Sequence, residues 1–159
     1  MGLFSGLQLG HIASSDADKQ AVFGAFRARR IGDITDGTSN TAAMAEGLTG
    51  PDRDLRGVVW HDQPGATQLY TMVTPNSPIS DVLYPYPTVW CVQSLPQKNR
   101  PCTSGDGSTT DIAAARSMHP GGVNVLLADG SCRFMSESIS LVQWRALATI
   151  GGAETGQEF

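Results

Sequence analysis

The most informative segment of the chain is His119-Pro-Gly-Gly-Val-Asn-Val-Leu-Leu-Ala-Asp-Gly-Ser-Cys-Arg-Phe134. Its Asp-Gly pair is a strong signal for a two-residue type I′ turn, because both central residues of that turn need a positive φ. Pairing about this turn sets Leu127 opposite Cys132. Side chains alternate along strands, so one shared apolar face is formed by Val123, Val125, Leu127, Cys132 and Phe134. We therefore predict a β-hairpin over residues 123–135 with this face in the core.

A helix is predicted after the hairpin, over residues 140–150. Ser140 can cap it, and Gln143 three residues later completes a capping box. Leu141, Trp144 and Leu147 form an apolar stripe, and two glycines at 151–152 end the helix. The stripe indicates that the helix packs against the sheet.

Composition indicates one loop-rich β or α+β domain rather than a helical bundle. With the hairpin and the helix, we predict one α+β domain with an antiparallel sheet. The chain has 159 residues, of which 16% are charged and 40% hydrophobic, with 18 Gly and 9 Pro. We expect residues 1–20 to be a loosely ordered leader and residues 21–159 to form the globular domain. A net charge of −4 gives no electrostatic footprint for nucleic acid, and no apolar run is long enough to span a membrane.

Residues 61–110 have little periodicity, and a loop region of this length inside a compact domain needs something to hold it in place. Cys91 and Cys102 flank a short loop that a disulfide would close, so we predict this pair. Cys132 falls on the predicted apolar face and is expected to be a buried free thiol. Residues 111–118 are expected to make a helical turn, which must end before Pro120.

Oxygen-bearing side chains gather in one turn-rich stretch: Asp33, Asp36, Ser39, Asn40 and Glu46. Calcium prefers carboxylate, amide and hydroxyl oxygens of this kind. The spacing is not that of an EF-hand loop, and the same residue types bond their own backbone in turns and caps. A calcium site and a self-bonded turn both remain open.

No arrangement of residues is typical of catalysis. His119 and Asp129 are separated by nine residues, about 30 Å along an extended strand, so they cannot form a dyad through it. Ser117 near His119 lies in no nucleophile elbow, and there is no phosphate loop or dinucleotide fingerprint. We expect a protein that is not an enzyme.

Two long motifs, Ile34-Thr-Asp-Gly-Thr-Ser-Asn-Thr41 with Glu46-Gly47 and the segment 115–134, resemble a prepilin-like family. This pilin- and pseudopilin-related family, from planctomycetes and related bacteria, has no known function. Its signature is a His, nine residues and then Asp-Gly. Further likeness lies in Thr74-Pro-Asn-Ser-Pro78, in Trp144-Arg-Ala-Leu147 and in the ending 151–154, so that about residues 21–155 are covered.

The resemblance implies a secreted or surface-exposed pilin-like head, here without the family's N-terminal helix, located outside the cell, on its surface or in the periplasm. It gives structural roles to the signature residues His119, Gly121, Gly122, Asp129, Gly130 and Trp144. The leading interpretation is a non-enzymatic structural or interaction domain of a pilin- or pseudopilin-like assembly, akin to type II secretion, with other protein subunits as partners. The alternative is an extracellular surface domain that binds calcium or a small ligand.

Overall fold

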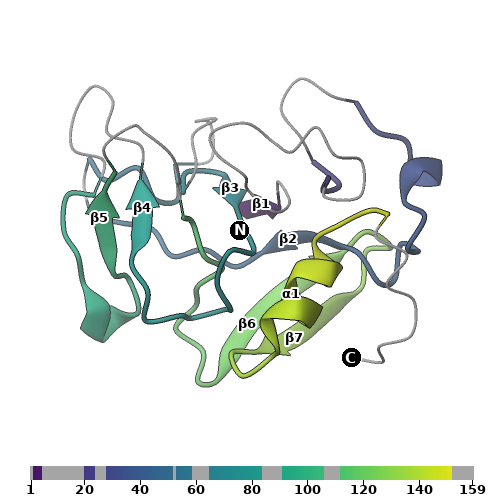
Figure 1. Ribbon diagram of the computed structural model, residues 1–159. Helices are drawn as coiled ribbons and strands as arrows, with labels where there is room; N and C mark the ends of the chain where they lie inside the picture. The colour runs from purple at the N-terminus through teal and green to yellow at the C-terminus, as the bar shows by residue number, and fades with distance from the viewer. Residues whose placement is uncertain are drawn as a thin grey trace.

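The computed structural model describes residues 2–4, 20–23, 28–51, 53–58, 65–83, 91–105 and 112–151, and only the backbone of residues 2–4. Within this part the chain folds into a five-stranded sheet, a separate two-stranded sheet and one α-helix (Figure 1). The predicted α+β class is confirmed in this form.

The larger sheet has the strand order β3-β1-β2-β6-β7. Its strands are β1 (Gly2–Phe4), β2 (Ala42–Ala45), β3 (Gln68–Leu69), β6 (Gly122–Leu127) and β7 (Cys132–Ser136). β1 pairs antiparallel with β2, β2 with β6, and β6 with β7, whereas β3 runs parallel to β1. The predicted antiparallel sheet with its hairpin is therefore confirmed over four strands, and β3 makes the whole sheet mixed.

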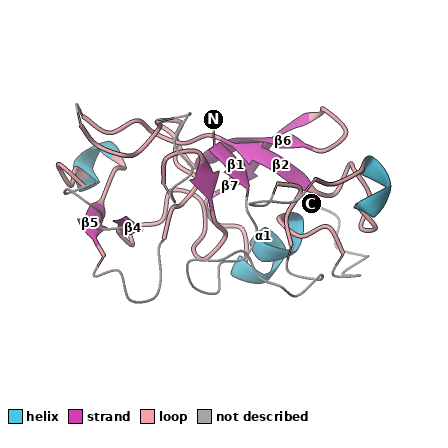
Figure 2. Ribbon diagram, turned by 90° about the horizontal axis from the view of Figure 1, so that it is seen from above, coloured by secondary structure: helices cyan, strands magenta, loops and turns pink. Residues whose placement is uncertain are grey.

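Helix α1 (Leu141–Leu147) covers one face of this sheet, as the two views together show (Figures 1 and 2). Trp144 and Leu147 are buried in one cluster with Val123 and Val125. Ser140 caps the helix as predicted, since its Oγ accepts a hydrogen bond from the Gln143 backbone N–H at 3.2 Å. The helix ends at Leu147 rather than at residue 150. It is too short to cross a membrane, as is every helix in the described segments.

The smaller sheet lies on the other side of the molecule from α1 (Figure 1). It consists of β4 (Asp81–Leu83) and β5 (Cys102–Ser104), which pair in parallel, and a short 3₁₀ helix, Pro96–Lys98, precedes β5. A second hydrophobic cluster of Leu55, Ala66, Leu83 and Cys102 packs here. The predicted disulfide between Cys91 and Cys102 is present.

The hairpin turn differs from the predicted two-residue turn. Gly130 has a φ of +88° and donates to the Leu127 carbonyl at 3.0 Å, while the Leu127 N–H donates to Ser131 at 2.8 Å. The loop therefore has three residues, 128–130, with glycine in the left-handed position. Asp129 does not take the positive φ that a type I′ turn requires.

This extra loop residue shifts the strand register by one. Leu126, not Leu127, lies opposite Cys132. A shift of one residue moves every side chain of a strand to the other face. The predicted burial of Cys132 and Phe134 is therefore wrong: Cys132 is exposed, Phe134 is 53% exposed, and Met135 packs in the core instead.

Residues 112–117 form an extended segment rather than the predicted helical turn. Ile112 exchanges two backbone hydrogen bonds of 2.9 Å with Val82 in the smaller sheet. Farther along, the Arg116 N–H donates to the Glu46 carbonyl, next to the larger sheet, at 2.9 Å. The segment thus connects the two sheets. Residue 111 of the predicted helical turn lies outside the described residues. So do residues 1 and 5–19 of the predicted leader, and residues 2–4 of that leader form β1.

Candidate functional site

The carboxylate of Glu46 is the centre of the signature region. Glu46 follows β2, and its Oε2 accepts the Asn124 backbone N–H at 2.8 Å. Its Oε1 accepts the Asn124 side-chain amide at 3.1 Å and lies 3.1 Å from Nε2 of His119. His119 therefore fastens the entry to β6 onto the end of β2.

The electrostatics of this cluster favour a charged carboxylate. Partial burial by itself would raise the pKa of Glu46, but hydrogen bonds from the Asn124 N–H, the Asn124 amide and His119 outweigh it and lower that pKa. The side chains of His119 and Glu46 are 54% and 25% exposed. The cluster is thus a polar clasp at the protein surface.

The signature glycines have steric reasons. Gly121 has a φ of +81°, a conformation that side chains disfavour. A Cβ on Gly122 would lie 2.1 Å from the Met135 carbonyl oxygen on the neighbouring strand. Both positions allow β6 to start close against β7.

Asp129 has a local role in the turn. Its Oδ1 accepts hydrogen bonds from the Ser131 hydroxyl at 2.7 Å and the Ser131 N–H at 2.8 Å. Both bonds lower the pKa of Asp129, and the bond from the hydroxyl lowers it more. The aspartate of the signature is therefore engaged in closing the hairpin.

A second polar cluster, formed by Ser117 and Asn76, holds the same entry to β6 through hydrogen bonds. Ser117 Oγ donates to the Gly122 carbonyl at 2.6 Å and accepts the His119 N–H at 3.0 Å. Asn76, with a left-handed φ of 54°, accepts the Ser117 N–H at 2.9 Å and donates to Gly122 at 3.1 Å. This gives the segment Thr74–Pro78 a structural task that its sequence did not reveal.

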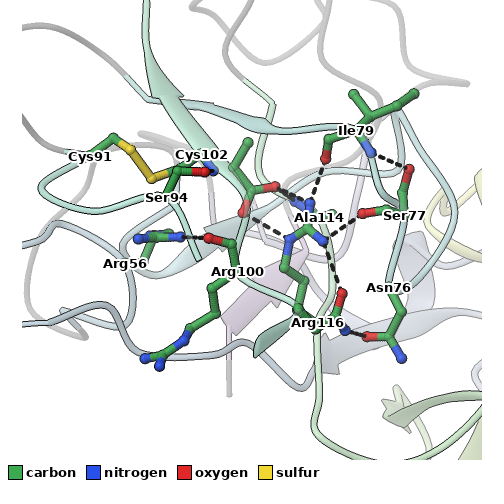
Figure 3. A network of polar contacts seen from close by, with 12 residues as sticks. Arg56, Asn76, Ser77, Ile79, Cys91, Ser94, Arg100, Cys102, Ala114 and Arg116 are labelled. Atoms are coloured by element: carbon green, nitrogen blue, oxygen red, sulfur yellow. Dashed lines mark hydrogen bonds and ion pairs between the residues drawn. A yellow bond between two sulfur atoms is a disulfide. The ribbon is translucent and has the colours of Figure 1, made fainter. Parts of the chain in front are cut away.

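Arg116 is the most heavily bonded side chain described (Figure 3). Its guanidinium meets both carboxylate oxygens of Asp81 at 2.9 and 3.0 Å. The remaining donors reach the carbonyls of Ser77 and Ile79, each at 2.7 Å, and Asn99 Oδ1 at 3.4 Å. All five guanidinium N–H groups are thus satisfied.

Both members of this ion pair are buried: Arg116 is 2% exposed and Asp81 3%. Burial raises the pKa of Asp81, and the Arg116 guanidinium and the Ala114 N–H oppose that rise. The pair holds together three chain segments in the part of the molecule that contains β4 and β5, which we call the loop-rich half. Local sequence patterns do not predict this pair, because its only local signal is a single arginine after the apolar run 112–115.

A second buried ion pair secures the disulfide loop. Arg56 contacts both oxygens of Asp54, at 2.8 and 2.7 Å. The same guanidinium donates to the carbonyls of Arg100 at 2.8 Å and Gln93 at 3.0 Å, on either side of residues 94–99. The described parts of the loop region 61–110 are therefore held in place by the disulfide and two buried ion pairs.

A cavity of about 150 Å³ lies between the two sheets. Its wall consists mainly of small residues, with the two buried arginines and Asp81 at its polar side. The lining residues are Gly47, Leu48, Thr49, Arg56, Gly57, Gly65, Ala66, Leu69, Asp81, Ala113, Ala114 and Arg116.

The five residues of the calcium hypothesis do not act together. Asp33 Oδ2 accepts the Arg30 N–H at 2.8 Å, and the Asn40 amide donates to the Asp36 carbonyl at 3.2 Å. Ser39 is exposed, and Glu46 bonds to Asn124 and His119 instead. Over the described segments, no three Asp, Glu, His or Cys residues are grouped so as to hold a metal ion. The calcium site stays a prediction.

Comparison with known proteins gives one match. A family model described as "Protein of unknown function (DUF1559)" matches residues 4–141. Neither a search of curated proteins nor a search of solved structures found a match.

Proposed function

The chain belongs to DUF1559, a prepilin-type family of unknown function, and on this basis we propose that its domain is a non-enzymatic structural or interaction module of a pilin- or pseudopilin-like assembly. Other protein subunits are its partners in this proposal. Its location is the cell surface, the periplasm or the extracellular space.

One observation carries the proposal: the polar signature side chains bind within the domain. Glu46 joins His119 to Asn124, and Asp129 closes the turn through Ser131. Side chains engaged in this way stabilise the fold of the domain. A domain whose signature residues stabilise its own fold suits a structural subunit that contacts other proteins.

The disulfide supports the proposed location. Disulfides form and persist in oxidising compartments and are rare in the cytosol. Cys91 is bonded to Cys102 across a loop that two further carbonyl contacts attach to Arg56. A disulfide-bonded domain of this kind is consistent with an extracytoplasmic location.

The proposal is tested by site-specific photo-crosslinking in the producing cells. A benzophenone amino acid is placed at Ile31 or Val142, which are 76% and 74% exposed, and at buried Val123 as the matched control. We expect larger cross-linked species in the extracytoplasmic fraction from the exposed positions only. Purely cytoplasmic protein, or no cross-link from either exposed position, would overturn the proposal.

The cavity between the sheets favours a second candidate, an extracellular domain that binds a small ligand. A thermal-shift screen of small uncharged molecules tests it. Gly47→Leu is the control, because Gly47 lines the cavity and an added Cβ there meets only Leu69, at 3.8 Å. Ligands that stabilise the native chain but not this variant would support the candidate; equal shifts in both would contradict it.

The calcium arm of this candidate has its own test. Calcium is titrated calorimetrically into protein stripped with a chelator, and Asp36→Asn serves as the variant. Heat that the variant lacks would support a site in residues 33–46. No heat and no thermal shift would overturn it.

A further inference from the structure

We propose that β7 is a self-pairing edge, through which two copies of this chain join antiparallel across a two-fold axis at Met135. This inference rests on the proposed assembly function and names a second copy of the chain as one partner. It follows from the sheet order, the hairpin register, and the charges along β7.

The first observation is that β7 ends the strand order. Among the described residues no strand pairs with its outer side. Hydrogen bonds from Leu127 to Ser131 and from Glu137 to Gly121 fix which backbone groups face β6. Because the pattern alternates, the N–H and C=O groups of Cys132, Phe134 and Ser136 point outward. Such a row of groups is a template for another strand.

The second observation is that β7 has neither a proline nor a bulge to block pairing at its edge. Natural edge strands use proline, bulges or charged side chains to prevent pairing with a second chain. The charged residue of β7, Arg133, opposes pairing only with a strand that offers it no opposite charge. Phe134 is 53% exposed despite its large apolar ring. A strand with this composition favours a partner at its edge.

Two registers bring the outward-facing residues of β7 together with those of its copy. An axis at Phe134, the midpoint of Cys132–Ser136, sets Phe134 opposite Phe134 and Cys132 opposite Ser136. An axis at Met135 instead sets Phe134 opposite Ser136 and Arg133 directly opposite Glu137.

Charge complementarity favours the axis at Met135. Arg133 in β7 and Glu137, the first residue after it, lie on the same side of the strand and are both exposed. With the axis at Phe134, Arg133 would be diagonal both to Glu137 and to Arg133 of the second copy. With the axis at Met135, Arg133 lies directly opposite Glu137 of the second copy, and opposite charges in directly opposed cross-strand positions are favourable. The two-fold axis creates this contact twice, with opposite charges each time.

Sedimentation equilibrium of the oxidised chain tests the pairing, with Cys132→Ser throughout so that no dimer is covalent. We expect a reversible dimer. Arg133→Glu or Glu137→Arg should each weaken it at least tenfold, because like charges then meet at both contacts. The double variant should restore it, and so should mixing the two single variants, since their charges are complementary. Thermal melts check that each variant is folded. This control is needed because Glu137→Arg also removes the 3.5 Å contact from the Asn76 amide to the Glu137 carboxylate.

A backbone variant gives an independent measurement. Phe134→Pro removes an N–H that points away from β6, and proline is tolerated at such edge positions. It should abolish the dimer and leave the circular dichroism spectrum unchanged, whereas Phe134→Tyr should still dimerise. A monomeric native chain, or single charge variants that dimerise like the native chain, would overturn the inference.

The two proposals can fail separately. Cross-links from Ile31 and Val142 in cells together with a monomeric purified chain would overturn the β7 pairing and leave the assembly role standing. A β7 dimer in solution without cross-links in cells would overturn the assembly role and leave the pairing standing.

Discussion

Arg116 is the residue on which the loop-rich half most depends, because its guanidinium joins Asp81 to the carbonyls of Ser77 and Ile79. Arg116→Met should lower the free energy of unfolding by about 3–5 kcal/mol, since it leaves a buried carboxylate without its partner. Urea denaturation measures this loss. Arg53→Met, at an exposed arginine, should change stability by no more than about 0.5 kcal/mol. Equal losses in both variants would contradict the structural role of Arg116.

Glu46 gives a second prediction at the residue scale, a dependence of stability on pH. Its pKa is lowered in the folded state from an ordinary value of 4.5, so the carboxylate stabilises the fold above that pH. This contribution is lost as the pH falls through the lower, folded-state pKa. Glu46→Gln should therefore be less stable than the native chain at pH 7, and the difference should shrink towards pH 3.

Urea denaturation from pH 7 to pH 3 checks this prediction. Asn124→Ala, which removes the amide donor but keeps the backbone N–H, should show an intermediate dependence on pH. A difference between Glu46→Gln and the native chain that is constant down to pH 3 would show that the Glu46 contacts do not control it.

Among the elements, the hairpin shows how far the sequence was sufficient. Alternating apolar residues and an Asp-Gly pair correctly predicted two strands and the burial of Val123, Val125 and Leu127. The same pair is compatible with a two-residue and a three-residue loop, because both can place Gly130 at a positive φ. Choosing the shorter loop reversed the faces of β7 and misplaced Cys132 and Phe134.

The hairpin also makes the third prediction, on its glycines. Gly122→Ala should destabilise by about 3 kcal/mol, because its Cβ would meet the Met135 carbonyl at 2.1 Å. Gly121→Ala meets no atom within 4 Å but keeps a positive φ, and should cost about 1–2 kcal/mol. Gly32→Ala, which has neither problem, should be nearly neutral. Thermal or urea denaturation gives the order, and a Gly122→Ala loss no larger than that of Gly32→Ala would refute the close strand approach.

Helix α1 was predictable for a local reason, and the ion pairs were not. Ser140 and Gln143, three residues apart, carry the whole capping signal. Arg116 and Asp81 lie 35 residues apart, and Arg116 contacts Ser77 at a separation of 39. Contacts at such distances depend on the fold itself, so local patterns could not reveal which charged residues are buried.

On the scale of the whole molecule, two differently stabilised halves are joined by the extended segment 112–117. The half with α1 has one large apolar cluster, to which Trp144 and buried residues of β2, β3, β6 and β7 contribute. The half with β4 and β5 has a much smaller cluster and relies on the disulfide, Arg56–Asp54 and Arg116–Asp81. The two halves should therefore respond differently when one covalent bond is removed.

The last prediction concerns that bond. Replacing Cys91 and Cys102 with serine should cost about 3 kcal/mol, because the denatured chain regains the freedom of the closed loop. In hydrogen exchange followed by mass spectrometry, amides of β4 and β5 should lose protection first, since Arg56 then holds a loop no longer fixed at its ends. Amides of β6 should stay protected, because their partners lie in β2 and β7. Cys132→Ser, at the exposed free thiol, should change neither half. Equal loss of protection in β4 and β6 would mean that the two halves unfold as one cooperative unit and that the disulfide stabilises both.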